Sequence, residues 1–134
     1  MNKRRLLTLA KFLEEKVPAK RFDMERWAAR DCGLDASNLN LCGTTACALG
    51  WPTMIPSFRR AGLSLEIINS DQSRGRVEYK GEENIYAAAG FFGVSADQAR
   101  DLFQPSSLGP YRYGPAATGR RIRRYVEKNG KSAS

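Results

Sequence analysis

The chain has 134 residues, of which 42% are hydrophobic and 27% are charged, and its formal net charge is +8. This composition is typical of a single folded domain and excludes wholesale disorder, while no apolar run reaches the roughly 20 residues that span a bilayer. Because the sequence contains no histidine, Ser-His-Asp and Cys-His catalysis and His-ligated metals are excluded, and we expect a non-enzymatic protein without a metal or a cofactor.

The first third of the chain is expected to be helical apart from one loop. Apolar residues at helical spacing predict a helix over residues 3–17. A second helix is predicted to start near Phe22, with Asp23 as its N-cap. Residues 31–43 contain several Gly, Asp, Ser and Asn residues and are predicted to form a loop. A third helix is expected to begin near Thr44 and to end at the prolines that follow.

A β-hairpin is predicted near residues 63–80, where apolar and polar residues alternate on both sides of a segment rich in turn formers. After Gly81, apolar residues at helical spacing predict another helix. Gly93 is predicted as the C-cap of that helix, and Ser95 with Gln98 as the capping box of the next. The last helix is expected to start at Pro115, because proline suits the first position of a helix.

Together these elements predict a mostly α-helical α+β fold, with about five to six helices around one core and a single β-hairpin near residues 63–80. Residues 1–130 are expected to form one globular domain, and residues 131–134 a disordered tail. The basic start of the chain resembles a signal peptide only as far as Lys11, because acidic residues follow the short apolar stretch. We therefore expect a cytoplasmic protein that does not bind membranes.

The excess positive charge lies at the two ends of the sequence. Residues 1–21 hold seven Lys/Arg and two Glu, residues 115–134 hold six Lys/Arg and one Glu, and the middle of the chain is slightly acidic. If the two ends meet in space, they form one basic face; otherwise they form two smaller patches. Arginine suits phosphate and carboxylate groups because its guanidinium donates two parallel hydrogen bonds.

These segments predict an anion-binding surface for nucleic acid or an acidic protein. The candidate residues are Lys3, Arg4, Arg5, Arg120, Arg121, Arg123 and Arg124. The alternative is a solvated helix face, on which arginines near the C-terminal end are favoured by the helix dipole.

The segment from Cys42 to Cys47 is the second candidate site. A glycine just before a helix start leaves backbone amides free to face an anion, which predicts a pocket for a nucleotide or another phosphorylated small ligand. A cysteine in a first helical turn also suggests a thiol-dependent enzyme. The structural alternative is a capped, buried helix whose small residues allow close packing. The pocket candidates are Cys42, Gly43, Thr44, Thr45, Cys47 and Trp51.

Four short motifs are spread along the chain. They are Phe22-Asp23-Met24-x-x-Trp27, Cys42-Gly43-Thr44-x-Ala46-Cys47-Ala48-x-Gly50-Trp51, Ala88-Ala89-x-Phe91-Phe92-Gly93-x-Ser95 and Leu102-Phe103-x-Pro105. Together they resemble a family of small uncharacterised bacterial and phage proteins, over roughly residues 6–126. The resemblance implies no activity. Its setting implies a phage or mobile-element accessory protein or inhibitor that acts by binding, either blocking a host protein or sequestering a ligand.

Overall fold

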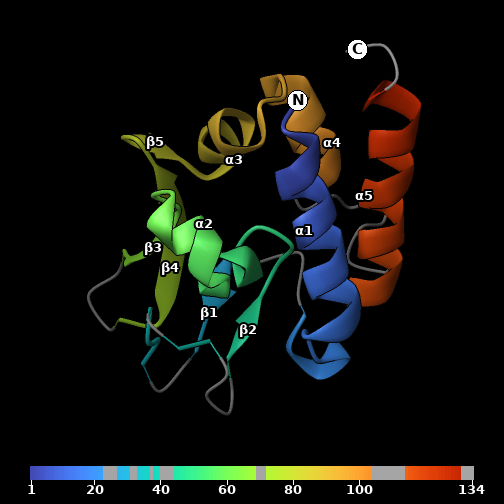
Figure 1. Cartoon of the computed structure of the whole chain (residues 1–134). Coiled ribbons are helices and arrows are strands. Elements are labelled where there is room, and N and C mark those ends of the chain that lie inside the picture. The colour runs from blue at the N-terminus through green and yellow to red at the C-terminus, as the bar shows by residue number, and fades with distance from the viewer. Residues whose placement is uncertain are drawn as a thin grey trace.

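The structure is a computed structural model of the protein (Figure 1). Two long helices pair along one side of the molecule, and a small β-sheet lies on the other side (Figure 1). The predicted tail over 131–134 lies outside the residues that the structure describes. Those residues are 1–22, 27–30, 33–36, 38–39, 44–68, 72–103 and 114–130.

Helices α1 (Lys3–Glu15) and α5 (Pro115–Gly130) form an antiparallel pair (Figure 1). The predicted first and last helices are therefore confirmed. A glycine allows the close approach of the two backbones, because a Cβ atom on Gly119 would lie 2.7 Å from the carbonyl oxygen of Ala10. The inner faces of both helices belong to the buried core. Their buried side chains include Leu6, Leu9, Leu13, Ile122 and Val126.

A five-stranded antiparallel sheet has the strand order β2-β1-β4-β3, and β5 pairs with β4. The strands are β1 (Ala28–Ala29), β2 (Thr45–Ala46), β3 (Ser64–Ile67), β4 (Arg74–Tyr79) and β5 (Glu82–Glu83). The prediction of a single β-hairpin near residues 63–80 is therefore wrong, although β3 and β4 do form a hairpin there. The other strands have only two residues each, which is too short for an alternating pattern to reveal them.

Thr44 does not start a helix, so the prediction of a third helix there is wrong. The residues after it form β2, and the chain then turns into the 3-10 helix η2 (Trp51–Met54). The reason is strand pairing, because Thr45 and Ala46 pair with β1. The turn that follows brings Gly50 against the backbone of Trp27, where a Cβ atom on Gly50 would lie 1.8 Å from the Trp27 carbonyl oxygen. Such close approach between backbones is a use of glycine. The described residues of the predicted loop over 31–43 contain no helix or strand.

The predicted helix starting near Phe22 is also wrong where the structure describes that segment. Ala28 and Ala29 form β1, which lies between β2 and β4. Phe22 itself forms an isolated parallel bridge with Ala46. Alanine favours helices, but pairing with two neighbouring strands overrides this weak local preference. The expected N-cap, Asp23, lies outside the described residues.

Of the two helices after the sheet, the first ends and the second begins where predicted. Helix α3 (Asn84–Phe92) ends at Gly93, whose φ of 66° is the left-handed conformation of a glycine C-cap. Helix α4 (Ala96–Phe103) begins with a capping box. The backbone N–H of Gln98 donates to Ser95 Oγ at 3.1 Å, and the backbone N–H of Ser95 donates to Gln98 Oε1 at 3.0 Å.

An aromatic cluster forms part of the core beside α3, α4 and the short helix α2 (Pro56–Arg60). The rings of Phe58 and Phe91 meet edge to face with centroids 4.8 Å apart, and those of Phe92 and Phe103 stack at 5.2 Å. Such ring pairs stabilise a core beyond their buried area.

The predicted mostly α-helical α+β class fits the structure. None of the helices in the described part of the chain is long and apolar enough to cross a membrane.

Candidate anion-binding surface

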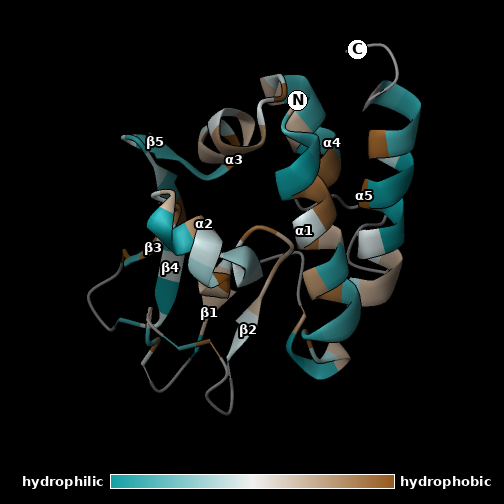
Figure 2. Cartoon of the chain, viewed as in Figure 1, coloured by the Kyte–Doolittle hydropathy of each residue, from teal (hydrophilic) through white to brown (hydrophobic). Residues whose placement is uncertain are grey.

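The pairing of α1 with α5 brings the two basic ends of the sequence together, so that they share one side of the molecule (Figure 1). Figure 2 shows hydrophilic residues along most of the visible surface of α5 and at the start of α1. A groove of about 580 Å³ runs along these helices and is lined by Lys3, Arg4, Leu7, Thr8, Lys11 and Arg123. We call it the α1–α5 groove. Cations from both ends of the chain therefore line the same groove.

Three of these cations are available to an anion. The side chains of Lys3, Arg4 and Lys11 are exposed, and none of them forms an ion pair with a residue that the structure describes. Lys11 is not among the residues predicted for the anion-binding surface. It lies two helical turns after Arg4 on the same face of α1, so its place beside Arg4 could have been predicted from the sequence.

Arg123 ties α5 to α1 through an ion pair with Glu14. Its Nε lies 3.0 Å from both carboxylate oxygens, and a terminal nitrogen lies 2.8 Å from one of them. Hydrogen bonding from Arg123 lowers the pKa of Glu14 below its ordinary value of 4.5, and the positive charge of Arg120 acts in the same direction. The bond to Glu14 in turn raises the pKa of Arg123. Part of the positive charge of Arg123 is thus already compensated.

Arg5 and Arg121, which were predicted to bind anions, make contacts within the protein. The Arg5 guanidinium lies 4.1 Å from the centroid of the Phe91 ring and donates to the Phe91 carbonyl oxygen at 2.8 Å. Arg121 donates to the backbone carbonyl oxygen of Asp101 in α4. Both side chains therefore link their helices to the end of the molecule formed by α3 and α4, and neither lines the α1–α5 groove.

Arg120 and Arg124 complete the predicted set. Both are exposed on α5, but they are not among the residues that line the α1–α5 groove. On the buried side of the same helix lie Thr118, Ile122 and Val126, as the helical spacing indicates. The structure therefore divides the seven predicted cations into groove residues, internal links and outward-facing arginines.

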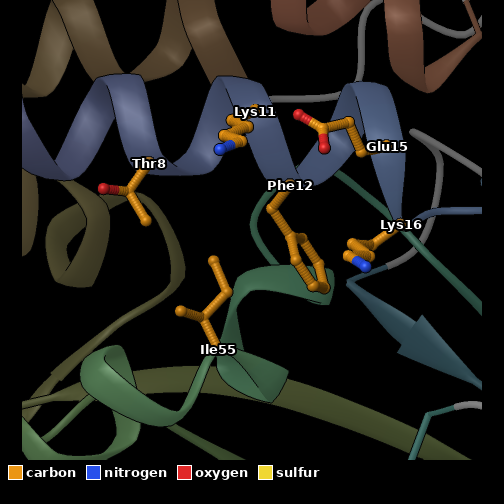
Figure 3. A pocket seen from close by; sticks show the side chains of 6 residues that line it. All are labelled: Thr8, Lys11, Phe12, Glu15, Lys16 and Ile55. Atoms are coloured by element: carbon orange, nitrogen blue, oxygen red, sulfur yellow. The ribbon is translucent and has the colours of Figure 1, made fainter.

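Two more hollows flank the exposed side of α1. One, of about 190 Å³, lies between α1 and Ile55, and Figure 3 shows the side chains around it. Its lining residues are Thr8, Lys11, Phe12, Glu15, Lys16 and Ile55. The other lies toward α2 and is lined by Asn2, Arg4, Arg5, Thr8, Ser57, Phe58 and Ala61. Thr8 borders all three hollows. Sequence reasoning did not find the flanking hollows, because they depend on segments that fold back against α1.

The sheet carries a charged cluster of a different kind. Arg76 forms ion pairs with Glu66 at 3.2 Å, Glu78 at 3.4 Å and Glu83 at 3.2 Å. Interaction with the neighbouring Glu66 carboxyl group raises the pKa of Glu78, while interaction with Glu78 and hydrogen bonding from Arg76 lower the pKa of Glu66. These acidic groups are paired with Arg76. Among the described residues that line the α1–α5 groove, by contrast, every charged residue is a cation.

The described residues of the segment from Cys42 to Cys47 do not form the helix start on which the predicted pocket depends. These residues run through β2, and the candidates Thr44, Cys47 and Trp51 are buried while Thr45 is half-buried. The Trp51 indole donates to the backbone carbonyl oxygen of Arg21 at 3.1 Å. Without a helix start, the argument for backbone amides that face a phosphate loses its basis, and the buried Cys47 thiol is closed to solvent. Cys42 and Gly43 lie outside the described residues.

No protein-family model, curated protein or solved structure matches this chain. The resemblance to small bacterial and phage proteins therefore stays a prediction. What defines the candidate site is the geometry of α1 and α5: a small α+β protein carries cations from both ends of its chain in one groove.

Proposed function

We propose that this protein is a non-enzymatic binding protein for an anionic partner, which it contacts through the α1–α5 groove. One observation carries the proposal: the antiparallel pairing of α1 and α5 places Lys3, Arg4 and Lys11 beside Arg123 in a single groove. The partner is a nucleic acid or an acidic protein surface. A phage or mobile-element accessory protein or inhibitor would use such a surface to occupy its partner.

The electrostatics of the groove support this function. Cations gathered in a hollow concentrate the positive electrostatic potential there. An anion that enters the hollow is therefore bound more strongly than it would be at scattered surface charges. Lys3, Arg4 and Lys11 can reach such an anion without first breaking an ion pair to a described residue. The affinity gained in this way should decrease as salt is added.

Binding of a small phosphorylated ligand at Gly43–Cys47 is a weaker candidate, because the described part of that segment is strand β2 with the buried residues Thr44 and Cys47 on either side. A thiol-dependent enzyme is weaker still. Cys47 is fully buried, and the sequence contains no histidine that could activate it as a base. The α1–α5 groove brings several exposed cations together in one hollow, and it is therefore the site we favour.

The test compares two double charge reversals that change the net charge equally. Arg4→Glu/Lys11→Glu alters the groove, and Lys20→Glu/Lys80→Glu alters two exposed lysines that do not line it. Fluorescence anisotropy with labelled duplex DNA, single-stranded RNA and poly-glutamate measures affinity over a range of salt concentrations. We expect the groove variant to weaken binding of the preferred polyanion at least about tenfold, and the control variant less than about threefold.

Two results would contradict the proposed function. The first is a wild-type protein that binds none of these polyanions at low salt. The second is equal loss of affinity in the two double variants, which would mean that net charge alone, and not the α1–α5 groove, attracts the anion. Thermal unfolding of each variant confirms that the comparison is made between folded proteins.

A further inference from the structure

The pocket between α1 and Ile55 has apolar walls and a charged rim. The Phe12 ring and the Ile55 side chain lie on facing sides of it, while Lys11, Glu15 and Lys16 project from α1 around it (Figure 3). Its volume is about 190 Å³. A dry cavity of roughly 150 Å³ is known to accept a benzene molecule, so this pocket has room for one large apolar side chain.

This pocket and the α1–α5 groove lie on the two sides of one helical ridge. Thr8 and Lys11 line both, and Arg4 lines the groove together with the hollow on the side of α2. A ligand that crosses α1 at Thr8 would therefore meet an apolar pocket and several cations at once. Leu7, which is 36% exposed, adds apolar surface beside the groove.

We propose that the partner is a protein that presents an acidic amphipathic segment to this ridge. One large apolar side chain of the segment, such as Leu, Met or Phe, enters the pocket between Phe12 and Ile55. Aspartate and glutamate side chains on either side of it contact Lys11, Lys16 and Arg4. This inference rests on the proposed anion-binding function and names the class of partner.

The pocket favours a protein over a nucleic acid for two reasons. Proteins that bind single strands commonly stack bases on exposed aromatic rings. Among the described residues that line the groove and the pocket, only Phe12 is aromatic, and its ring forms a pocket wall. In addition, Glu15 lies on the pocket rim between the cations. Its carboxylate would repel a continuous phosphate backbone, whereas a peptide can place its carboxylates so as to avoid it.

The experiment selects binders from a displayed library of short random peptides, with the wild-type protein as bait. Selected peptides are then synthesised and their affinities measured by fluorescence anisotropy. Thr8→Trp fills the entrance of the pocket from an exposed position. Ser64→Trp is the matched control, at an exposed position of β3 that lines neither the pocket nor the groove. Lys16→Glu is a second variant, which changes the rim without filling the pocket.

We expect the selected peptides to combine an excess of Asp and Glu with one large apolar residue. Replacing that residue by alanine, or using Thr8→Trp, should weaken binding about tenfold, because a buried anchor residue dominates such interfaces. Lys16→Glu should weaken binding in the same direction, whereas Ser64→Trp should leave the affinity within about twofold of wild type.

The failures of the two proposals are distinguishable. Acidic peptides that need Arg4 and Lys11, but bind equally after loss of the apolar residue and to Thr8→Trp, would overturn the pocket and leave the anion-binding function. A nucleic acid that binds more tightly than every selected peptide, with the same dependence on Arg4 and Lys11, would overturn a protein as partner. Selected peptides without excess acidic residues, together with no effect of Arg4→Glu/Lys11→Glu on any polyanion, would overturn both.

Discussion

Arg123 of α5 holds Glu14 of α1 in a two-pronged ion pair, with nitrogen–oxygen distances of 2.8–3.0 Å. The two residues are 109 positions apart in the sequence, and their contact links the last helix to the first. The α1–α5 groove depends on this arrangement, because Lys3, Arg4 and Lys11 face Arg123 only when the two helices are paired.

Removal of this ion pair should have a small effect on stability that depends on pH. Because the pKa of Glu14 is lowered in the folded protein, its contribution is present above pH 4.5 and is lost as the pH falls through the folded pKa. The side chains of Arg123 and Glu14 are 43% and 23% exposed, so we expect Glu14→Gln to cost only about 0.5–1 kcal/mol at neutral pH. Denaturant unfolding of wild type and variant at neutral and acidic pH measures the difference, and a difference that stays constant with pH would contradict the account.

Gly119→Ala should destabilise the protein, because the added Cβ would lie 2.7 Å from the carbonyl oxygen of Ala10 and the helices would have to separate. We expect a loss of about 1–3 kcal/mol in the free energy of unfolding. Gly90→Ala is the matched control, since a Cβ there meets only the Tyr79 ring at an ordinary 3.5 Å. That substitution within α3 should be neutral or stabilise by about 0.5–1 kcal/mol. Equal effects of both variants in denaturant unfolding would mean that the helix contact is looser than described.

Substitutions should distinguish the arginines that link α1 and α5 to the rest of the protein from the cations that bind the partner. Arg5→Met loses the contact with Phe91 and Arg121→Met loses the bond to Asp101. We expect each to lower the free energy of unfolding by about 1 kcal/mol and to change polyanion affinity little. The same replacement at Arg4 or Lys11 should weaken polyanion binding and leave the unfolding free energy nearly unchanged.

Unfolding curves and anisotropy titrations of the four methionine variants measure both quantities. We expect the Arg5 and Arg121 variants to lose stability but keep their affinity, and the Arg4 and Lys11 variants to lose affinity but keep their stability. If Arg5→Met or Arg121→Met weakened binding as much as Arg4→Met without loss of stability, those arginines would belong to the binding surface.

Cys47 should react slowly with thiol reagents in the native protein. Its side chain is fully buried, and its Sγ accepts a hydrogen bond from the backbone N–H of Leu49 at 3.3 Å. In a Cys32→Ser/Cys42→Ser background, we expect a chromogenic disulfide reagent to label Cys47 only as fast as the structure opens. Rapid labelling of the folded protein would contradict this burial and would revive the thiol-dependent alternative.

Features that depend only on residues close together in the sequence were predictable. The end of α3 follows from Gly93, which adopts a conformation that favours glycine, and the start of α4 follows from the reciprocal bonds of Ser95 and Gln98. The small strands were not predictable. Ala28–Ala29 and Thr45–Ala46 become strands only because they pair with each other and with β4, and two residues show no period of their own.

The candidate site was predictable as a concentration of charge but not as a set of contacts. Helical spacing correctly predicts that Ile122 is buried and that arginines lie on the outer side of the last helix. It cannot predict that Arg5 lies over the Phe91 ring or that Arg123 forms an ion pair with Glu14. Nor can the sequence show that Ile55 folds back against α1 to form a pocket. These contacts join distant parts of the chain, so local patterns do not determine them.

Mapping of amide chemical shifts by NMR tests the central claim most directly. The isotope-labelled wild-type protein is titrated with whichever polyanion binds it best, at low and at moderate salt. We predict that the largest shifts occur at the residues of the α1–α5 groove, which are Lys3, Arg4, Leu7, Thr8, Lys11 and Arg123, and that they diminish with salt. Shifts centred on Arg120 and Arg124, or on Thr44–Cys47, with the groove unperturbed, would contradict the claim that the paired first and last helices form the binding site.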